Sequence, residues 1–238
     1  MSTTPVTREY LETIYNLTVE GDPVVGVRLA EKFGVSAPNV AQTLERMQKD
    51  GLISMPGRGR GRSGAGIELT EQGKAEAEAL LRQHRLAERF LVDVLGMDWV
   101  QAHEEAHNME RGMSPEIEAH LMQLLNNPRT CPHGNPIPMG NFNTLEYLRE
   151  QHAVRLNSVP EGNRMKVLLI SEVVEDETAV LTQLGEMDIM PGAKVLVLSN
   201  DRQEHILSVQ VTPRGDRTQD DRTVTLPEDL AAKIWVRD

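Results

Sequence analysis

The fold is decided by residues 84–110, which read HRLAERFLVDVLGMDWVQAHEEAHNME. Gly96 divides this stretch, so it predicts two helices joined by a short turn, the second starting at Asp98. Imidazole and carboxylate side chains recur at steps of three and four, and so share one face of each helix, at His84, Glu88, His103, His107 and Glu110. Because such faces can converge on one cation, the stretch predicts a metal cluster.

For each residue taken alone there is a less specific interpretation. A single histidine on a helix is more often a core or surface residue, and Arg111 offers Glu110 a surface salt bridge. The prediction therefore rests on the group, with Glu9 and Glu12 of an N-terminal helix as further donors. Cys131 is the only cysteine, which excludes an intrachain disulfide and a thiolate-rich zinc or iron–sulfur site.

The composition is that of an ordinary globular protein. Hydrophobic residues make up 39% and charged residues 26%, and no apolar run approaches the roughly 20 residues that a bilayer requires. The length of 238 residues suits two or three domains. No secretion signal opens the chain, so we expect a cytoplasmic protein that does not span a membrane.

Charge is distributed unevenly around a net value of −11. Residues 24–62 carry seven Lys/Arg against three Asp/Glu, a local charge of +4, whereas residues 158–238 carry nine against fifteen. This pattern favours a basic DNA-binding patch on an otherwise acidic protein.

The basic region predicts a helix-turn-helix. Apolar residues at helical spacing indicate three helices, over residues 7–19, 27–33 and 36–49. Gly34 breaks the second, and Ser36 caps the third. The third helix would enter the major groove, where Asn39 and Gln42 can pair with adenine. The candidate DNA-contacting residues are Arg28, Ser36, Pro38, Asn39, Gln42, Thr43, Arg46 and Lys49.

A wing is predicted after these helices. Short strands at 52–53 and 67–69 flank a loop of alternating glycine and arginine, whose candidate DNA contacts are Arg58, Arg60 and Arg62. Such a loop alone is more often a solvated flexible segment. Its place after a helix-turn-helix favours the wing.

Further along, the pattern predicts a helical region followed by a small β-barrel. Helices over 70–95, 98–110 and 115–125 carry leucines that suit a dimer interface. A Pro/Gly-rich linker, 129–140, contains Cys131 and His133, which we interpret as incidental loop residues because one thiol and one imidazole do not fill a coordination sphere. Five short strands between 167 and 236, with a helix near 179–184, predict the barrel.

The chain resembles the diphtheria toxin repressor family of metal-dependent transcriptional repressors. The matching stretches run in family order at Tyr10–Tyr15, Ser36–Thr43, His84–Arg89, His103–His107 and Gly134–Pro138. The resemblance implies an α+β fold in four parts: a winged helix-turn-helix domain (1–74), an all-helical dimerisation and metal-binding domain (75–140), a linker (141–161) and an SH3-like domain (162–238).

The resemblance also implies two metal positions. The first is matched by His84, Glu88, His103 and, from the C-terminal domain, Glu177. The second would draw on Glu9, His107 and Glu110. Iron-type members have methionine and cysteine in place of Glu9 and His107, and Arg111 stands where a histidine is common. Glu9 and Glu12 resemble the acidic pair of manganese-type members.

These features predict a homodimeric repressor of metal-homeostasis genes that binds double-stranded operator DNA. Imidazole and carboxylate donors favour Mn²⁺ over Fe²⁺, while Zn²⁺, Co²⁺ or Cd²⁺ would also bind in vitro. Two alternatives stay open: a helical His/carboxylate metalloenzyme, and a winged-helix regulator of a small organic effector. The cluster comes with no obvious nucleophile, which disfavours the enzyme.

Overall fold

The computed structural model describes residues 4–56, 66–140, 142–174, 176–214 and 221–238. The chain forms two compact units, one of residues 1–83 with 138–145 and one of residues 84–137 with 146–238. Helix α4 (Glu71–Asp93) contributes to both units. None of the helices in the described ranges is both long and apolar enough to cross a bilayer.

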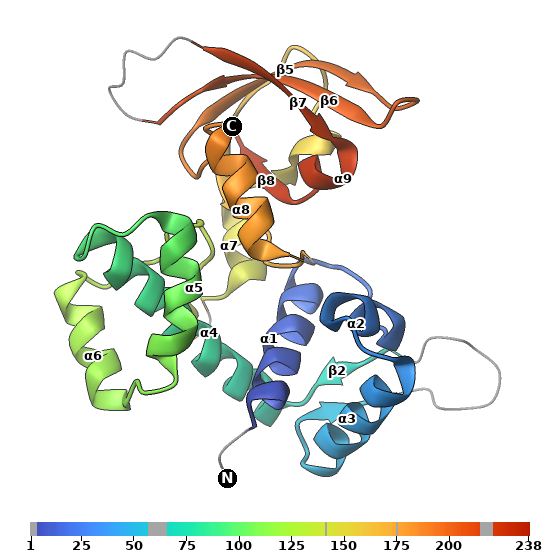
Figure 1. Ribbon diagram of the computed structural model, residues 1–238, viewed down its shortest axis with the longest axis vertical. Coiled ribbons are helices and arrows are strands. Elements are labelled where there is room, and N and C mark those ends of the chain that lie inside the picture. Colours follow the sequence, from blue (N-terminus) through green and yellow to red (C-terminus); the bar gives the residue numbers. More distant parts are fainter. Residues whose placement is uncertain (1–3, 57–65, 141, 175, 215–220) are drawn as a thin grey trace. The chain divides into compact units, whose positions relative to one another are not determined.

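The first unit is a helix-turn-helix with a short two-stranded sheet. Its helices are α1 (Pro5–Val19), α2 (Gly26–Phe33) and α3 (Ala37–Lys49), each within two residues of the predicted start (Figure 1). Strands β1 (Ile53–Ser54) and β2 (Glu68–Leu69) pair antiparallel, with Ile53 opposite Leu69. The core of this unit is formed by apolar side chains from all three helices, among them Leu11, Ile14, Leu29, Val40, Leu44 and Met47.

The second unit begins with a helical layer. The C-terminal part of α4 packs with α5 (Trp99–Glu110) and α6 (Pro115–Leu124) around a small apolar core. Asp98 caps α5 by accepting a hydrogen bond from the Val100 amide at 2.9 Å, and Ser114 caps α6 by accepting one from the Ile117 amide at 3.2 Å. Both caps confirm the predicted helix starts.

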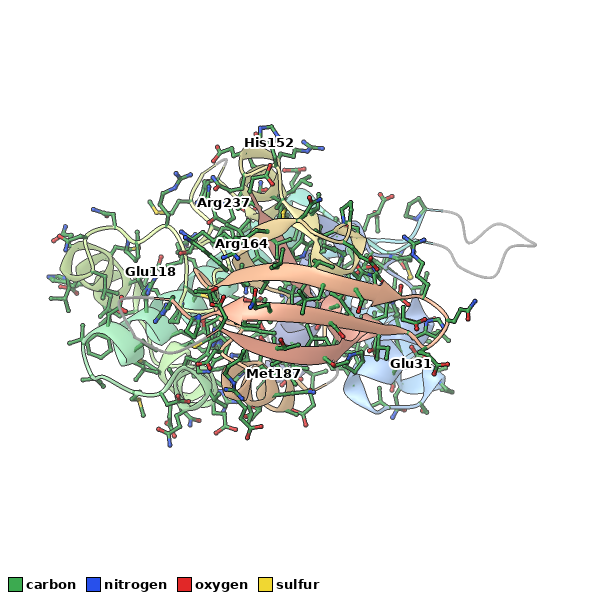
Figure 2. The ribbon with its side chains drawn as sticks, turned by 90° about the horizontal axis from the view of Figure 1, so that it is seen from above. Glu31, Glu118, His152, Arg164, Met187 and Arg237 are labelled. Carbon is green, nitrogen blue, oxygen red and sulfur yellow. The ribbon has the colours of Figure 1, made fainter. Side chains whose placement is uncertain are left out.

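A six-stranded antiparallel sheet forms the rest of the second unit. Its order is β3-β8-β4-β5-β6-β7. The strands are β3 (Val154–Arg155), β4 (Arg164–Ile170), β5 (Lys194–Asp201), β6 (Ile206–Thr212), β7 (Arg222–Pro227) and β8 (Ile234–Arg237). Buried residues alternate with more exposed ones along β6, as a sheet with one covered face requires. Figure 2 looks down on the sheet and shows strands lying side by side. The inner face packs against α8 (Glu177–Glu186) and α9 (Glu228–Ala231).

Two features of this unit differ from the prediction. Five strands were expected, and β3 is a sixth at the edge beside β8. The segment 141–161, expected as a linker, contains α7 (Thr144–Glu150), β3 and the 3-10 helix η1 (Leu156–Ser158). All three elements are shorter than the window over which hydrophobic periodicity can be recognised, so no pattern predicted them.

The first turn of α4 lies against the backbone of Leu52, the residue before β1. A Cβ atom added at Gly73 would collide with the Leu52 carbonyl. We therefore expect Gly73→Ala to lower stability by about 1–3 kcal/mol, measured as a lower urea-unfolding midpoint. Gly66→Ala is the matched control, because no atom of the described residues lies within 4 Å of a Cβ added there. Equal midpoints for the two variants would contradict this packing.

Candidate metal centre

Five of the predicted metal ligands come together in the second unit from two helices. His84 and Glu88 lie one turn apart on α4, and His103, His107 and Glu110 lie on one face of α5. All except His107 are buried. His107 has 48% of its side chain exposed.

The centre of the cluster is a single carboxylate oxygen, Glu88 Oε1. Three imidazole nitrogens face it: His103 Nδ1 at 2.9 Å, His84 Nε2 at 3.1 Å and His133 Nδ1 at 3.1 Å. Only a nitrogen that carries a proton can donate to this oxygen, so in the absence of a cation the arrangement depends on protonated rings. Once those protons are lost, the nitrogen lone pairs and the carboxylate oxygen face a common region, which is the arrangement of donors that a divalent cation requires.

His84 links this oxygen to a second carboxylate. Its Nδ1 lies 2.8 Å from Glu110 Oε2 while its Nε2 faces Glu88. Both ring nitrogens can donate only in the imidazolium form. Glu110 in turn lies 4.0 Å, through Oε1, from His107 Nδ1.

Glu177 joins the cluster as the resemblance implied. It is the first residue of α8, whose N-cap Asp176 accepts a hydrogen bond from the Ala179 amide at 2.9 Å. Its Oε2 lies 3.6 Å from His103 Nε2. Asp176 thus serves the helix, Glu177 faces the cluster, and residue 175 lies outside the described residues.

Cys131 and His133 also belong to the cluster, contrary to our interpretation of them as incidental loop residues. Both are buried, and their ligand atoms lie within 4.8 Å of one another and of a Glu88 oxygen. His133 Nε2 donates to the Trp99 carbonyl at 3.0 Å, which orients the ring so that Nδ1 faces Glu88 Oε1 at 3.1 Å. The Cys-x-His spacing was the available signal, but the third donor lies more than 40 positions away in sequence.

A tightly held loop positions these two residues. The Ile170 amide donates to the His133 carbonyl at 3.0 Å, and the Asn135 side chain donates to the Ile170 carbonyl at 2.8 Å. Gly134, between them, has φ +88°, and a Cβ there would meet the Leu168 carbonyl. The loop therefore accepts only glycine at this position, and its conformation is fixed by the end of β4.

Burial and mutual contact shift the pKa values of these groups. Burial lowers the pKa of His84, but Glu88 and Glu110 outweigh it and raise the pKa well above 6.5. Burial raises the pKa of Glu110, but the nearby imidazoles of His107 and His84 outweigh it and lower the pKa to about 2. The pKa of Glu88 is likewise held well below 4.5, whereas burial and the Glu88 charge raise the pKa of the Cys131 thiol. Protons on the imidazoles thus supply positive charge among the carboxylates.

These residues fit a divalent cation. Glu88 Oε2 is buried and has no hydrogen-bond partner among the described residues, which is costly unless a ligand uses it. The donors around it are imidazole nitrogens, carboxylate oxygens and one thiol sulfur, a set that first-row transition metals accept.

The second predicted position is met only in part. His84, His103 and His107 bring ligand nitrogens within 4.8 Å of one another, and Glu110 contacts both His84 and His107. The other predicted donors, Glu9 and Glu12, lie on α1 in the first unit, and their convergence with His107 and Glu110 stays a prediction.

The DNA-contact candidates lie on the helix-turn-helix. On and before α3, the exposed ones are Ser36, Pro38, Asn39, Gln42, Arg46 and Lys49. Thr43 is half-buried and hydrogen-bonds Tyr10, while Arg28 pairs with Asp22 at 3.3 Å, so both also have structural roles. Arg58, Arg60 and Arg62 lie outside the described residues.

Family models match most of the chain. Residues 2–59 match an iron-dependent repressor N-terminal DNA-binding domain, residues 70–139 an iron-dependent repressor metal-binding and dimerisation domain, and residues 154–238 a FeoA domain. The iron-dependent repressor IdeR of Mycobacterium tuberculosis is 37% identical over 97% of this chain and 96% of its own length. The chain belongs to the iron-dependent repressor family.

Further relatives of this repressor support the assignment. The diphtheria toxin repressor of Corynebacterium diphtheriae is 33% identical over 98% of this chain and 96% of its own length. A manganese-dependent transcriptional repressor in complex with manganese is 28% identical, with a TM-score of 0.77 over 97% of this chain and 99% of that one. The manganese regulator SloR is 25% identical, with a TM-score of 0.77 over 99% of both chains. The family confirms the predicted fold class and a metal-dependent, DNA-binding transcriptional repressor.

The metalloenzyme alternative is wrong, because the family and the relatives are transcriptional repressors. Residues 103–107 do have the His-Glu-x-x-His spacing that is typical of helical zinc hydrolases. In this repressor Glu104 is exposed, away from the buried His103. The His-Glu-x-x-His spacing alone would therefore have predicted a hydrolase, which is the wrong class of protein.

We expect the metal-free repressor to lose stability as the pH rises above about 6.5, the unfolded pKa of histidine. A raised pKa in the folded state makes the contribution of His84 fully present below its unfolded pKa near 6.5, and this contribution is lost as pH rises through the folded pKa. The carboxylates act in the opposite direction: their contribution is present above 4.5, and that of Glu110 is lost as pH falls toward about 2. Thermal unfolding in chelator measures the profile.

The matched variant for this prediction is His84→Gln, which removes the titrating ring at the centre of the network. As the pH rises above about 6.5, its unfolding temperature should fall less than that of the wild type. The exposed His120→Gln should keep the wild-type profile. An identical slope for His84→Gln and wild type would show that this cluster does not carry the effect.

Proposed function

We propose that this protein is a cytoplasmic, homodimeric repressor that binds operator DNA when Mn²⁺ occupies the cluster around Glu88 and His84, and thereby controls metal-homeostasis genes. The observation that carries the proposal is the approach of three imidazole nitrogens to Glu88 Oε1, at 2.9–3.1 Å, in a member of a metal-dependent repressor family. The division into domains at 1–74, 75–140 and 162–238 is part of the proposal, while segment 141–161 contains α7, β3 and η1.

The proposed ligands are His84, Glu88, His103 and Glu177 at one position and His107, Glu110, Glu9 and Glu12 at the other, with Cys131 and His133 added to the first. A bound Mn²⁺ would supply the positive charge that imidazole protons supply in its absence. The histidines then lose their protons and turn lone pairs inward, so affinity should rise with pH.

The ligands derive from separate segments of the chain, and this gives the switch its physical basis. His84 and Glu88 lie on α4, which also contributes to the DNA-binding unit, whereas His103 and Glu177 lie on α5 and α8. A cation can favour the DNA-competent arrangement only by binding it more tightly than the alternative, typically by about 1–3 kcal/mol. In this proposal the difference arises because the cation binds ligands from α4, α5 and α8 at once and so holds these helices together.

Mn²⁺ is proposed over Fe²⁺ because the donors of the second position are oxygen and imidazole only. The relatives do not agree on the metal: IdeR is named as iron-dependent, and several structural neighbours as manganese regulators. ScaR is described as manganese-activated, yet it has also been crystallised with Cd²⁺ and with Zn²⁺. Zn²⁺, Co²⁺ or Cd²⁺ binding to this chain would therefore not identify the cellular metal.

The first test measures metal-stimulated DNA binding. A duplex selected by this protein from a random pool with Mn²⁺ should bind at least about tenfold more tightly in Mn²⁺ than in chelator, measured by fluorescence anisotropy. His84→Ala/His103→Ala should abolish the difference because the first position loses two of its proposed ligands. His120→Ala/His205→Ala, two exposed histidines, is the matched control and should retain it. Equal affinity of the wild type in Mn²⁺ and chelator would end the proposal.

The second test concerns base recognition by α3. Gln42 is exposed in the part of the helix expected to face the bases. Gln42→Ala should cost about 1–3 kcal/mol on the selected duplex and relax preference at one base pair. Gln48→Ala, exposed near the end of the same helix, should do neither. Uniform weakening on all sequences would instead mean that Gln42 contacts the backbone.

A further inference from the structure

Arg85, next to the ligand His84, is a buried arginine with no role in the metal cluster itself. It is 1% exposed and is among the largest fully buried side chains. Its Nε and Nη2 donate to the two oxygens of Glu172 at 3.0 Å and 2.7 Å, and its Nη1 donates to the Pro136 carbonyl at 2.6 Å. This bidentate geometry fixes orientation as well as distance.

The partner, Glu172, lies two residues after Ile170, the last residue of β4. The preceding residue, Ser171, is anchored to the sheet, since its amide donates to the Lys233 carbonyl at 2.8 Å. Five positions after Glu172 the chain reaches Glu177, the first residue of α8 and the one carboxylate that α8 directs at His103. The ion pair thus joins the part of α4 that carries two ligands to the entrance of the helix that carries another.

The other end of α8 is seated on α5. A Cβ at Gly185 would lie 3.1 Å from Trp99 Nε1, so only glycine permits this approach without displacing the ring. Trp99 also accepts the hydrogen bond from His133 through its carbonyl. The helix is therefore held at its start by Arg85–Glu172 and near its end by Trp99.

Burying an ion pair at this contact carries a large desolvation cost. Burial raises the pKa of Glu172, but Arg85 outweighs it and keeps the carboxylate ionised. Apolar residues of similar volume often replace a buried pair at little cost to stability, so the pair contributes orientation more than stability. The bidentate geometry is suited to a role in positioning the segment that contains Glu172.

We propose that the Arg85–Glu172 pair is a positioning clamp that docks the start of α8 onto α4, so that Glu177 reaches the cluster of His84, Glu88 and His103. The inference rests on the proposed metal function and adds two residues that are not ligands. The clamp acts before any cation binds, because its contacts are made entirely between protein groups.

The clamp predicts a specific pattern of Mn²⁺ affinities in the full-length protein. Glu172→Gln and Arg85→Lys should each weaken Mn²⁺ binding about tenfold, as loss of a supporting contact to a ligand element does. Asp188→Asn, which alters the ion pair with Arg222 in the same unit, is the matched control and should have no effect. Arg85→Lys keeps the charge and loses the two-pronged contact, so a purely electrostatic effect of Glu172 predicts no change for it.

A double-mutant cycle with Glu177→Gln separates docking from other causes. If the clamp works by presenting Glu177, Glu172→Gln should add no further loss of Mn²⁺ affinity in the Glu177→Gln background. A full additional loss in that background would overturn the clamp. So would unchanged affinity of both Glu172→Gln and Arg85→Lys in an otherwise wild-type protein.

A metal-free readout distinguishes failure of the clamp from failure of the proposed function. In a Trp235→Phe background, emission from Trp99 reports the seating of α8, and Glu172→Gln in chelator should shift it to longer wavelength. Unchanged emission would overturn docking by the clamp, whatever the metal does. A wild type that fails to bind Mn²⁺ would instead remove the metal site, and the role of the clamp in it.

Discussion

The structure depends on one constraint: several ionisable side chains are buried around Glu88 and must neutralise one another. Burying an uncompensated carboxylate is costly, so the imidazoles of His84, His103 and His133 have to face it. Without a cation they do so as proton donors. Because metal and protons compete for the same nitrogens, the cluster responds to a divalent ion by exchanging one form of positive charge for another.

The elements around the cluster follow from this constraint. Two ligands one turn apart require a helix, and the break at Gly96 turns the chain so that a second helix faces the first. The loop with His133 is fixed to β4 by one backbone hydrogen bond and by the Asn135 side chain, and the conformation at Gly134 keeps it there. The small sheet domain therefore orients metal donors, and Arg85 and Glu172 extend the same principle to Glu177.

How much was predictable depends on the range of the interaction. The helices that carry ligands and the helix-turn-helix could be predicted, since periodicities of three and four residues are local and caps such as Asp98 and Ser114 lie beside the helices they start. Glu177 came only from the family resemblance, because no local pattern relates it to His103. Cys131 and His133 were misinterpreted, since their significance depends on Glu88, which is distant in sequence.

The donor set also bears on the choice of metal, and its two parts point in different directions. Cys131 adds a sulfur to the Glu88 group, which favours softer ions once the thiol is deprotonated, but burial and the nearby Glu88 charge raise the pKa of that thiol. At His107 and Glu110 the only donors are imidazole and carboxylate, which suit Mn²⁺. Selectivity should therefore be set by the His107 and Glu110 group, while the Glu88 group tolerates several ions. On this reasoning, replacing His107 by cysteine should change the metal preference more than removing Cys131.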